Sequence, residues 1–298
     1  MAKVSIGYPV YNEERWARRS LDSLLSQTCA DFEVIACDNA STDSTWEIIQ
    51  NYAALDKRVK PVRQKENVGA VKNFHFALDQ ADGQYFLWAA GDDWWDARFI
   101  ETLVSALDNN PDYGAAMCSV TRVFDDGEVK NEISFTGAND ITRLSKEDVF
   151  RKMVAGEHIH HLVNAIFRTA ELKKVAIRPI PPCARGDRVF MSEAALAIRF
   201  YTVPQSLYKK TVYRKKRSEK YSATDSGLGS AWTSPKSHTR YTFAMLSRLM
   251  TSKLIPLAQK GLALRQWAKM AWGSRGLLLE EAAPRLSGYL ARRKEAKG

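Results

Sequence analysis

The sequence predicts an α/β fold, with a mostly parallel central sheet, helices on both faces and a C-terminal helical extension. Short apolar segments alternate with amphipathic segments up to residue 112, which is typical of parallel strands connected by helices. From residue 114 two strand-like runs flank the turn Asp125-Asp-Gly127. After the Ser/Gly-rich stretch 222–230 only helical spacing remains. We therefore predict three parts, 1–112, 113–221 and 222–298.

The individual elements follow from apolar periodicity, because period 2 or a continuous apolar run indicates a strand and spacings of three and four indicate a helix. In the first part we expect strands at 3–8, 31–36, 58–64 and 84–90, and helices at 13–27, 44–55, 70–80 and 97–107. Beyond it we expect strands at 115–124, 128–135 and 200–208, and helices at 145–154, 169–175, 188–198 and within 235–295.

Cysteine usage and hydropathy indicate a cytoplasmic protein. The four cysteines, Cys29, Cys37, Cys118 and Cys183, show neither close pairing nor metal-ligand spacing, so we expect reduced thiols. The chain enters a strand directly after its first residues, and we expect no secretory signal. The absence of any run of 18 apolar residues predicts that nothing spans a bilayer.

The net charge of +10 is distributed unevenly. Residues 1–200 contain 24 Lys and Arg against 29 Asp and Glu, whereas residues 201–298 contain 20 against only 5. Such asymmetry favours contact of the last part with phosphates or an anionic surface, with a merely solvated basic face as the alternative. We therefore expect this part to contact an anionic partner.

The basic tail also carries apolar residues at helical spacing. Its apolar residues are Phe243, Leu246, Leu249, Met250, Leu254, Leu257, Trp267 and Trp272, interspersed with the cations Arg248, Lys253, Lys260, Lys269 and Arg275. This pattern suits an interfacial helix on an anionic membrane, so the protein could lie peripherally at the inner face. Core packing, a nucleic-acid site and a homodimer contact are the alternatives.

Two adjacent carboxylates end the most apolar strand. The run Tyr85 to Trp88 is followed by Gly91, Asp92 and Asp93. Acids behind a buried strand lie at its carboxyl end, where open α/β sheets bind their ligands. Neighbouring carboxylates repel each other unless a divalent cation or a hydroxyl-rich ligand compensates them. A solvated turn is the alternative.

Other expected strands end in polar segments as well. The first leads into Pro9-Val-Tyr-Asn-Glu-Glu14 and the second into Asp38-Asn-Ala-Ser-Thr-Asp43. Because parallel strands bring their carboxyl ends to one edge, these segments should converge with Asp92 and Asp93 on one crevice. Such a cluster could bind a nucleotide together with Mg²⁺ or Mn²⁺. Neither Gly-x-Gly-x-x-Gly nor a P-loop is present, which argues against a dinucleotide oxidoreductase and a P-loop kinase.

These segments, with Asn67-Val-Gly69, resemble in their order the motifs of inverting family 2 glycosyltransferases of the GT-A fold, a Rossmann-like architecture. The resemblance covers roughly residues 3–210. It implies transfer of a sugar from a nucleotide-sugar donor, most simply a UDP-sugar, to a hydroxyl acceptor such as a glycan or a lipid-linked glycan. A transferase acting on nucleic acid and a non-catalytic binding module are the alternatives.

The resemblance also implies roles for single residues in the first part. Nucleotide-binding residues would be Pro9, Tyr11, Glu13, Asp38, Asn67, Gly69, Lys72 and Asp92, with Asn73 beside them and Asp38 accepting a hydrogen bond from the base. A divalent metal would be held by Asp93, the preferred ligand, and Asp92. Most family members carry an acid where this chain has Ala90, so we expect a weaker metal site or one that relies on protein cations.

The acceptor side and the catalytic base are expected in the second part. The resemblance implies that Asp187 takes the proton of the acceptor hydroxyl; a helix-start acid is the alternative. The acceptor pocket would be lined by His158, His161, Asn164 and Arg168, and the diphosphate would meet Arg214, Lys215, Lys216 and Arg217. A solvated charge run is the alternative for these last four residues.

Overall fold

A computed structural model describes residues 2–178, 181, 185–214 and 237–278. Within these residues nine strands form one sheet in the order β3-β2-β1-β4-β8-β6-β9-β5, with β7 paired to β6. The first four strands are β1 (Val4–Val10), β2 (Phe32–Asp38), β3 (Val59–Arg63) and β4 (Tyr85–Trp88), all parallel. Their connecting helices are α1 (Ala17–Leu25), α2 (Thr45–Leu55) and α3 (Ala70–Asp79).

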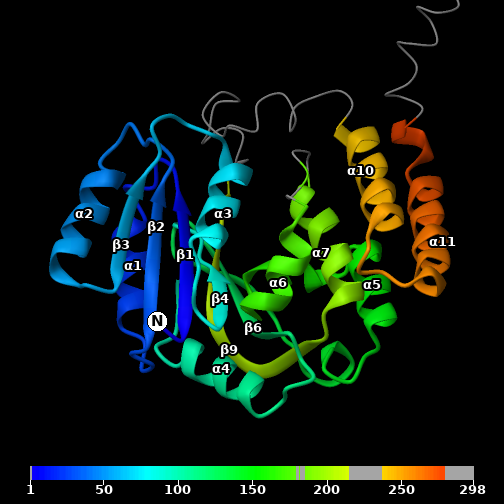
Figure 1. Cartoon of the computed structure of the whole chain (residues 1–298), viewed down its shortest axis with the longest axis horizontal. Helices are drawn as coiled ribbons and strands as arrows, with labels where there is room; N and C mark the ends of the chain where they lie inside the picture. Colours follow the sequence, from blue (N-terminus) through cyan, green and yellow to red (C-terminus); the bar gives the residue numbers. More distant parts are fainter. Residues whose placement is uncertain (1, 179–180, 182–184, 215–236, 279–298) are drawn as a thin grey trace, which may run out of the picture.

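The strand order reverses beside β1. The chain passes from β1 outward to β2 and β3 and then returns to add β4 on the other side of β1. Such a reversal opens a crevice outside the carboxyl ends of the strands. Figure 1 shows these ends at one edge of the sheet, with α3 in front of it.

The second half of the sheet is mixed. Its strands are β5 (Trp94–Trp95), β6 (Ala115–Phe124), β7 (Val129–Ile133), β8 (Ile166–Arg168) and β9 (Phe200–Val212). Since β8 is antiparallel to both β4 and β6, and β9 is parallel to β6, the end of β9 lies at the same edge as the end of β4. The helical segments are α4 (Phe99–Asp108), η1 (Gly137–Asn139), α5 (Lys146–Ala155), η2 (His158–Asn164), α6 (Thr169–Ala176) and α7 (Gly186–Ala197).

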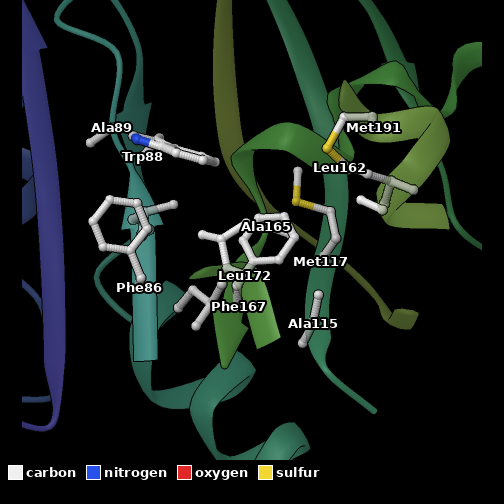
Figure 2. Packing of buried hydrophobic residues seen from close by; sticks show 14 of the residues in the cluster. Phe86, Trp88, Ala89, Ala115, Met117, Leu162, Ala165, Phe167, Leu172 and Met191 are labelled. Atoms are coloured by element: carbon white, nitrogen blue, oxygen red, sulfur yellow. The ribbon is translucent and has the colours of Figure 1, made fainter. Parts of the chain in front are cut away.

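The core is centred on Trp88 at the end of β4. Its ring meets Phe86, Phe167 and Phe190 edge-on, with centroids 5.1, 6.4 and 6.0 Å away, the favoured geometry for aromatic pairs. Its indole N–H donates to the Phe74 carbonyl of α3 over 3.0 Å. Figure 2 shows the Trp88 ring pointing from β4 toward side chains of β8, β6, α6 and α7. The end of β4, which leads to the two acids, is thus fixed by packing on the face of the sheet that carries Phe86 and Trp88.

Two helices follow at the end of the described chain, α10 (Ser237–Thr251) and α11 (Leu257–Gly273). Two residues of the expected apolar stripe, Phe243 and Leu257, are 64% and 85% exposed, so the core-packing alternative does not hold for them. The buried positions of α10 are Tyr241, Thr242, Met245, Arg248 and Leu249. None of the described helices combines the length and apolar character needed to cross a membrane.

The fold prediction is confirmed: the sheet is mostly parallel, helices cover it and helices end the described chain. The sequence interpretation missed β5, β8 and η2, which contain two, three and seven residues. Such short segments carry no measurable periodicity. The sheet continues across residue 112, so the first two expected parts are halves of one sheet.

Candidate active site

Two loops at the crevice are joined by side chains. Asn12, behind β1, accepts from the Thr42 backbone N–H over 2.9 Å, and its own N–H donates to the Ser41 hydroxyl over 3.0 Å. One residue on, the Glu13 N–H donates to the Thr45 hydroxyl over 2.7 Å. These bonds satisfy backbone groups that a loop would otherwise leave unpaired. The predicted residue Glu13 is 6% exposed, and its position is fixed by this network.

Among the described residues, strained non-glycine backbone occurs only near the predicted site residues. In the described chain three non-glycine residues have positive φ: Asn12 at 52°, Ala40 at 60° and Arg185 at 61°. They lie within two residues of Glu13, Asp38 and Asp187, respectively. Left-handed backbone is costly for residues with a Cβ and persists where the surroundings impose it, often at functional sites.

Asp38 lies at the end of β2 and is fully buried. Its carboxylate accepts from the Ser41 N–H over 3.1 Å and contacts the Arg63 guanidinium at 3.1 Å. Burial raises the pKa of Asp38, while the bonds from Ser41 and the charge of Arg63 oppose the shift. Asp38, which we predicted to bind the nucleotide base, therefore lies inside the loop after β2 and helps to hold that loop through its bond with Ser41.

The segment before α3 approaches the same loop. Asn67 accepts from the Asn39 side chain over 2.8 Å and from the Gly69 N–H over 2.9 Å. Gly69 has a φ of 87°, which a residue with a Cβ adopts only with strain. Asn73 donates to the Cys37 carbonyl over 2.8 Å, and Lys72 is exposed. Asn67 and Gly69 thus lie beside the loop that holds Asp38.

The turn after β4 packs closely on the loop after β1. A Cβ on Gly91 would stand 2.8 Å from a Val10 methyl group and 3.1 Å from Glu13, so only glycine permits this approach. Asp92 follows with 6% exposure and accepts from the Tyr213 hydroxyl over 2.8 Å. Asp92 is therefore brought next to the predicted nucleotide loop.

Asp93 has a different environment. It is fully buried, accepts from the Thr211 N–H over 2.8 Å and from the Tyr208 hydroxyl, and pairs with the Lys210 ammonium at 3.3 Å. Burial raises its pKa despite the opposing charge of Lys210. We ranked Asp93 above Asp92 as metal ligand, but the contacts give Asp92 the more accessible carboxylate. The role of either acid as a metal ligand stays a prediction.

Arg19 brings a second cation to the acids. Its guanidinium lies 3.6 Å from the centroid of the Trp94 ring and donates to the Asp92 carbonyl over 3.0 Å. Burial lowers the pKa of Arg19, an effect that the charges of Asp93 and Asp92 oppose. The two acids are thus accompanied by two protein cations, Arg19 and Lys210.

The donor set at the crevice fits a divalent metal only in part. Across the described ranges, no group of three His, Cys, Asp or Glu side chains could hold a metal ion. Position 90 is alanine, and the oxygens of Asp93 are engaged. Mg²⁺ in phosphate-transfer sites often takes one or two carboxylates, with substrate phosphates and water as its other ligands. Asp92 fits that minimal role.

The predicted base, Asp187, lies in the first turn of α7 and is exposed. One turn further on, Phe190 contacts Trp88, so α7 packs against the strand that leads to Asp92. Arg185 before it lies 5.9 Å from the centroid of the Tyr241 ring of α10. The structure thus anchors the start of α7 between β4 and α10.

The predicted acceptor residues separate into two groups. His161 and Asn164 are buried in η2 at 3% and 8% exposure, and η2 packs on β4, α5 and α7. His158 begins the same segment. Arg168 pairs in register with Tyr85, at the start of β4, and donates to the Leu107 and Tyr113 carbonyls over 2.7 and 3.0 Å. The acceptor role predicted for Arg168 is corrected, because it lies at the opposite edge of the sheet.

Of the four cations predicted to bind the diphosphate, Arg214 is the one that the structure describes. Arg214 follows β9 and pairs with Asp126 at 2.5 Å and with Glu128, both in the turn between β6 and β7. Lys215, Lys216 and Arg217 lie outside the described residues, as does Cys183.

The contribution of β9 to the crevice was missed. We ended that strand at Tyr208, whereas it continues to Val212 and supplies the Tyr208, Lys210 and Thr211 contacts to Asp93, with Tyr213 following. The β-favouring run Thr-Val-Tyr213 is the signal that could have extended it. Arg19 carried no such signal, since its partner Trp94 is distant in sequence.

Comparison with known proteins agrees with this geometry. The family model described as glycosyl transferase family 2 matches residues 5–175. The chain belongs to glycosyl transferase family 2. Its fold resembles that of Staphylococcus aureus TarS, with a TM-score of 0.66 at 20% identity over 91% of this chain and 72% of that one. It also resembles the mannosyltransferase PcManGT of Pyrobaculum calidifontis, solved with GDP-Man and Mn²⁺, with a TM-score of 0.57 at 17% identity, covering 97% of this chain and 80% of the other.

Relatives by sequence are named glycosyltransferases. An uncharacterized glycosyltransferase of Haemophilus influenzae is 27% identical over 73% of this chain and 68% of its own length. The glycosyltransferase GlyA of Streptococcus pneumoniae is 31% identical over 35% of this chain. The match spans only 15% of GlyA, so the activity of that whole protein does not carry over.

Proposed function

We propose that the protein transfers a sugar from a nucleotide-sugar donor, UDP-linked, to an acceptor hydroxyl with inversion at the anomeric carbon. One observation carries the proposal. The segments after β1, β2, β4 and β9 meet at one edge of the sheet and bring Glu13, Asp38 and Asp92 together with Arg19 and Lys210. Family membership and the solved TarS complex with UDP-GlcNAc support a nucleotide-sugar donor.

The chemistry requires a base on the acceptor and a stabilised leaving group. Asp187 takes the proton from the acceptor hydroxyl as the acceptor oxygen forms its bond to the anomeric carbon. The bond from that carbon to the diphosphate oxygen breaks on the opposite face. Arg19 and Lys210 place positive charge at the crevice, where negative charge grows on the departing diphosphate. A divalent metal held by Asp92 would supply further positive charge to the diphosphate when bound.

The decisive experiment separates binding from chemistry. Asp187→Asn keeps the shape of the side chain and removes its basicity, so transfer should fall by roughly 10²–10⁴-fold while UDP binding, followed by calorimetry, stays unchanged. Glu171→Gln is the matched control, since Glu171 is also an acid in the first turn of a helix but lies near Gly114, at the other edge. Loss of UDP binding in Asp187→Asn would refute the assignment of Asp187 as base.

The identity of the donor and the need for metal are tested together. A thermal-shift screen over UDP, GDP, dTDP and CMP, each with and without Mn²⁺, should show the largest stabilisation with UDP and Mn²⁺. Donor hydrolysis with EDTA then tests turnover. Full activity in EDTA would remove the metal from the proposal and leave protein cations such as Arg19 and Lys210 to compensate the charge.

A non-catalytic sugar-nucleotide-binding module is the second candidate, favoured by Ala90 and by the engaged oxygens of Asp93. It predicts UDP binding without hydrolysis of any donor. Measurable turnover that disappears in Asp187→Asn excludes it.

A further inference from the structure

The outward face of α11 carries exposed apolar side chains. Leu257, Leu264 and Trp272 are 85%, 46% and 70% exposed. Their spacings of seven and eight residues place them along one face of the helix. The opposite face is packed, with Ala263 fully buried and the Trp267 indole N–H donating to the Thr242 carbonyl of α10 over 2.8 Å. Helix α11 therefore packs on the protein through one face and exposes this apolar face to solvent.

The charge on this face is of one sign. Between residues 237 and 278 the sequence contains seven Lys or Arg and no Asp or Glu. Of the seven, Arg248 is buried. The other six are Arg240, Lys253, Lys260, Arg265, Lys269 and Arg275. Elsewhere on the surface cations meet local acids, as in the pairs Arg151–Asp148 and Lys174–Glu171.

The cations flank the apolar face. Arg265 and Lys269 follow Leu264 and Ala268 by one residue on the same helix, so they lie about 100° to one side of them, and Lys260 lies on the other side. Arg275 donates to the Trp272 carbonyl over 3.1 Å, with its guanidinium 4.9 Å from the centroid of the Trp272 ring. An apolar stripe with Trp, bordered by long cationic side chains, is the composition of interfacial membrane helices.

We propose that the outward face of α11, defined by Leu257, Leu264, Trp272, Arg265 and Lys269, docks on the surface of an anionic lipid bilayer. Trp272 and the two leucines would enter the headgroup region, and the cations would meet lipid phosphates with no acid on α11 itself to repel them. A nucleic acid would also attract the cations, but it offers little to two exposed leucines. The apolar component therefore favours the bilayer.

The location of the face is compatible with catalysis at a surface. Figure 1 shows α10 and α11 side by side, at the end of the molecule opposite to α2 and β3. Docking through α11 leaves the nucleotide-binding half uncovered. The inference does not depend on the proposed transfer reaction, because vesicle binding can be measured without turnover.

The test is flotation of the full chain with phosphatidylcholine vesicles that contain about 30 mol% phosphatidylglycerol. We expect flotation with these vesicles, little with pure phosphatidylcholine, and strong reduction when NaCl rises from about 0.1 to about 0.5 M. Arg265→Gln/Lys269→Gln should weaken partitioning about 30-fold, from about fivefold per cation. Trp272→Ala/Leu264→Ala should weaken it at least about tenfold.

The matched control is Lys57→Gln/Lys60→Gln, which removes two exposed cations near the start of β3 and should leave partitioning within about twofold. Unchanged melting temperatures would show that the surface variants fold. Absence of flotation, or an equal loss in the control variant, would overturn the proposal. So would a gel shift with DNA that depends on Arg265 and Lys269 while the vesicles bind nothing.

Discussion

Asp93 and Glu193 are both buried acids paired with cations, yet their surroundings differ. Glu193 of α7 is 2% exposed and pairs with Arg248 of α10 at 2.5 Å and with Arg178 at 3.3 Å. Arg248 also donates to the Val175 and Arg178 carbonyls over 3.1 and 2.9 Å. The ion pairs and the bonds to backbone carbonyls together hold α10 against α7.

The Asp93 network lies beside the crevice instead. A second acid, Asp92, directly precedes Asp93 and is 6% exposed, whereas Glu193 has no acid next to it in the sequence. Strained backbone occurs beside the predicted site residues, at Asn12, Ala40 and Arg185. The comparison teaches that a buried ion pair alone does not mark a site; a second acid beside the pair and strained loops distinguish the crevice from the helix contact.

The largest effect should come from breaking the Glu193 network. Arg248→Met leaves Glu193 buried with only the more exposed Arg178 as partner, and should lower the free energy of unfolding by about 3–5 kcal/mol. Urea denaturation monitored by tryptophan fluorescence measures it. Arg240→Met, an exposed position on the same helix, should change it by less than about 0.5 kcal/mol. A small loss for Arg248→Met would mean that the pair does not secure α10.

Asp92→Asn should show the opposite behaviour, affecting activity more than stability. The amide keeps the acceptor for Tyr213 but loses the charge, so kcat/KM for donor hydrolysis or transfer should fall about 100-fold. The free energy of unfolding should change by only about 1 kcal/mol. Asp96→Asn, an exposed acid nearby in sequence, serves as the control. Equal kinetics for both variants would remove Asp92 from the site.

Lys210→Met should make stability depend on pH. Without its cation the pKa of Asp93 rises further, because burial already raises it. A carboxyl group whose pKa is higher in the folded than in the unfolded state favours folding only while it is protonated. The free energy of unfolding therefore falls as the pH rises above the pKa that Asp93 has in the unfolded chain. We expect a loss of about 1–2 kcal/mol at pH 8 and less at pH 5. Lys209→Met, exposed on the same strand, should show no such trend.

The smallest effect concerns the strained loop. Ala40→Gly should raise the free energy of unfolding by about 0.5–1 kcal/mol, because glycine tolerates a left-handed backbone. Ala54→Gly, exposed inside α2, should lower it by a similar amount. Thermal denaturation of both variants measures the difference. The same sign for both would mean that the backbone at Ala40 stores no strain.

Much of the fold was predictable because its larger elements are periodic. The strand at 115–124 was placed as observed, and most expected helices and strands of the first half match to within two residues at their ends. The start of the first helix was wrong, since α1 begins at Ala17 rather than residue 13; the segment 11–16 is held in the crevice loop by cross-loop bonds.

The sequence by itself determined the α/β class, the family and the set of acids at the carboxyl ends of the strands, because these depend on periodicity and on short ordered motifs. Only the tertiary structure decided which acids are accessible, since Thr211, Tyr208 and Lys210 reach Asp93 from a strand more than 100 residues away in sequence. It also decided the opposite fates of two tail residues. Arg248 is buried against Glu193, whereas Trp272 faces outward, because packing against α7 and α10 selects which helix face is covered.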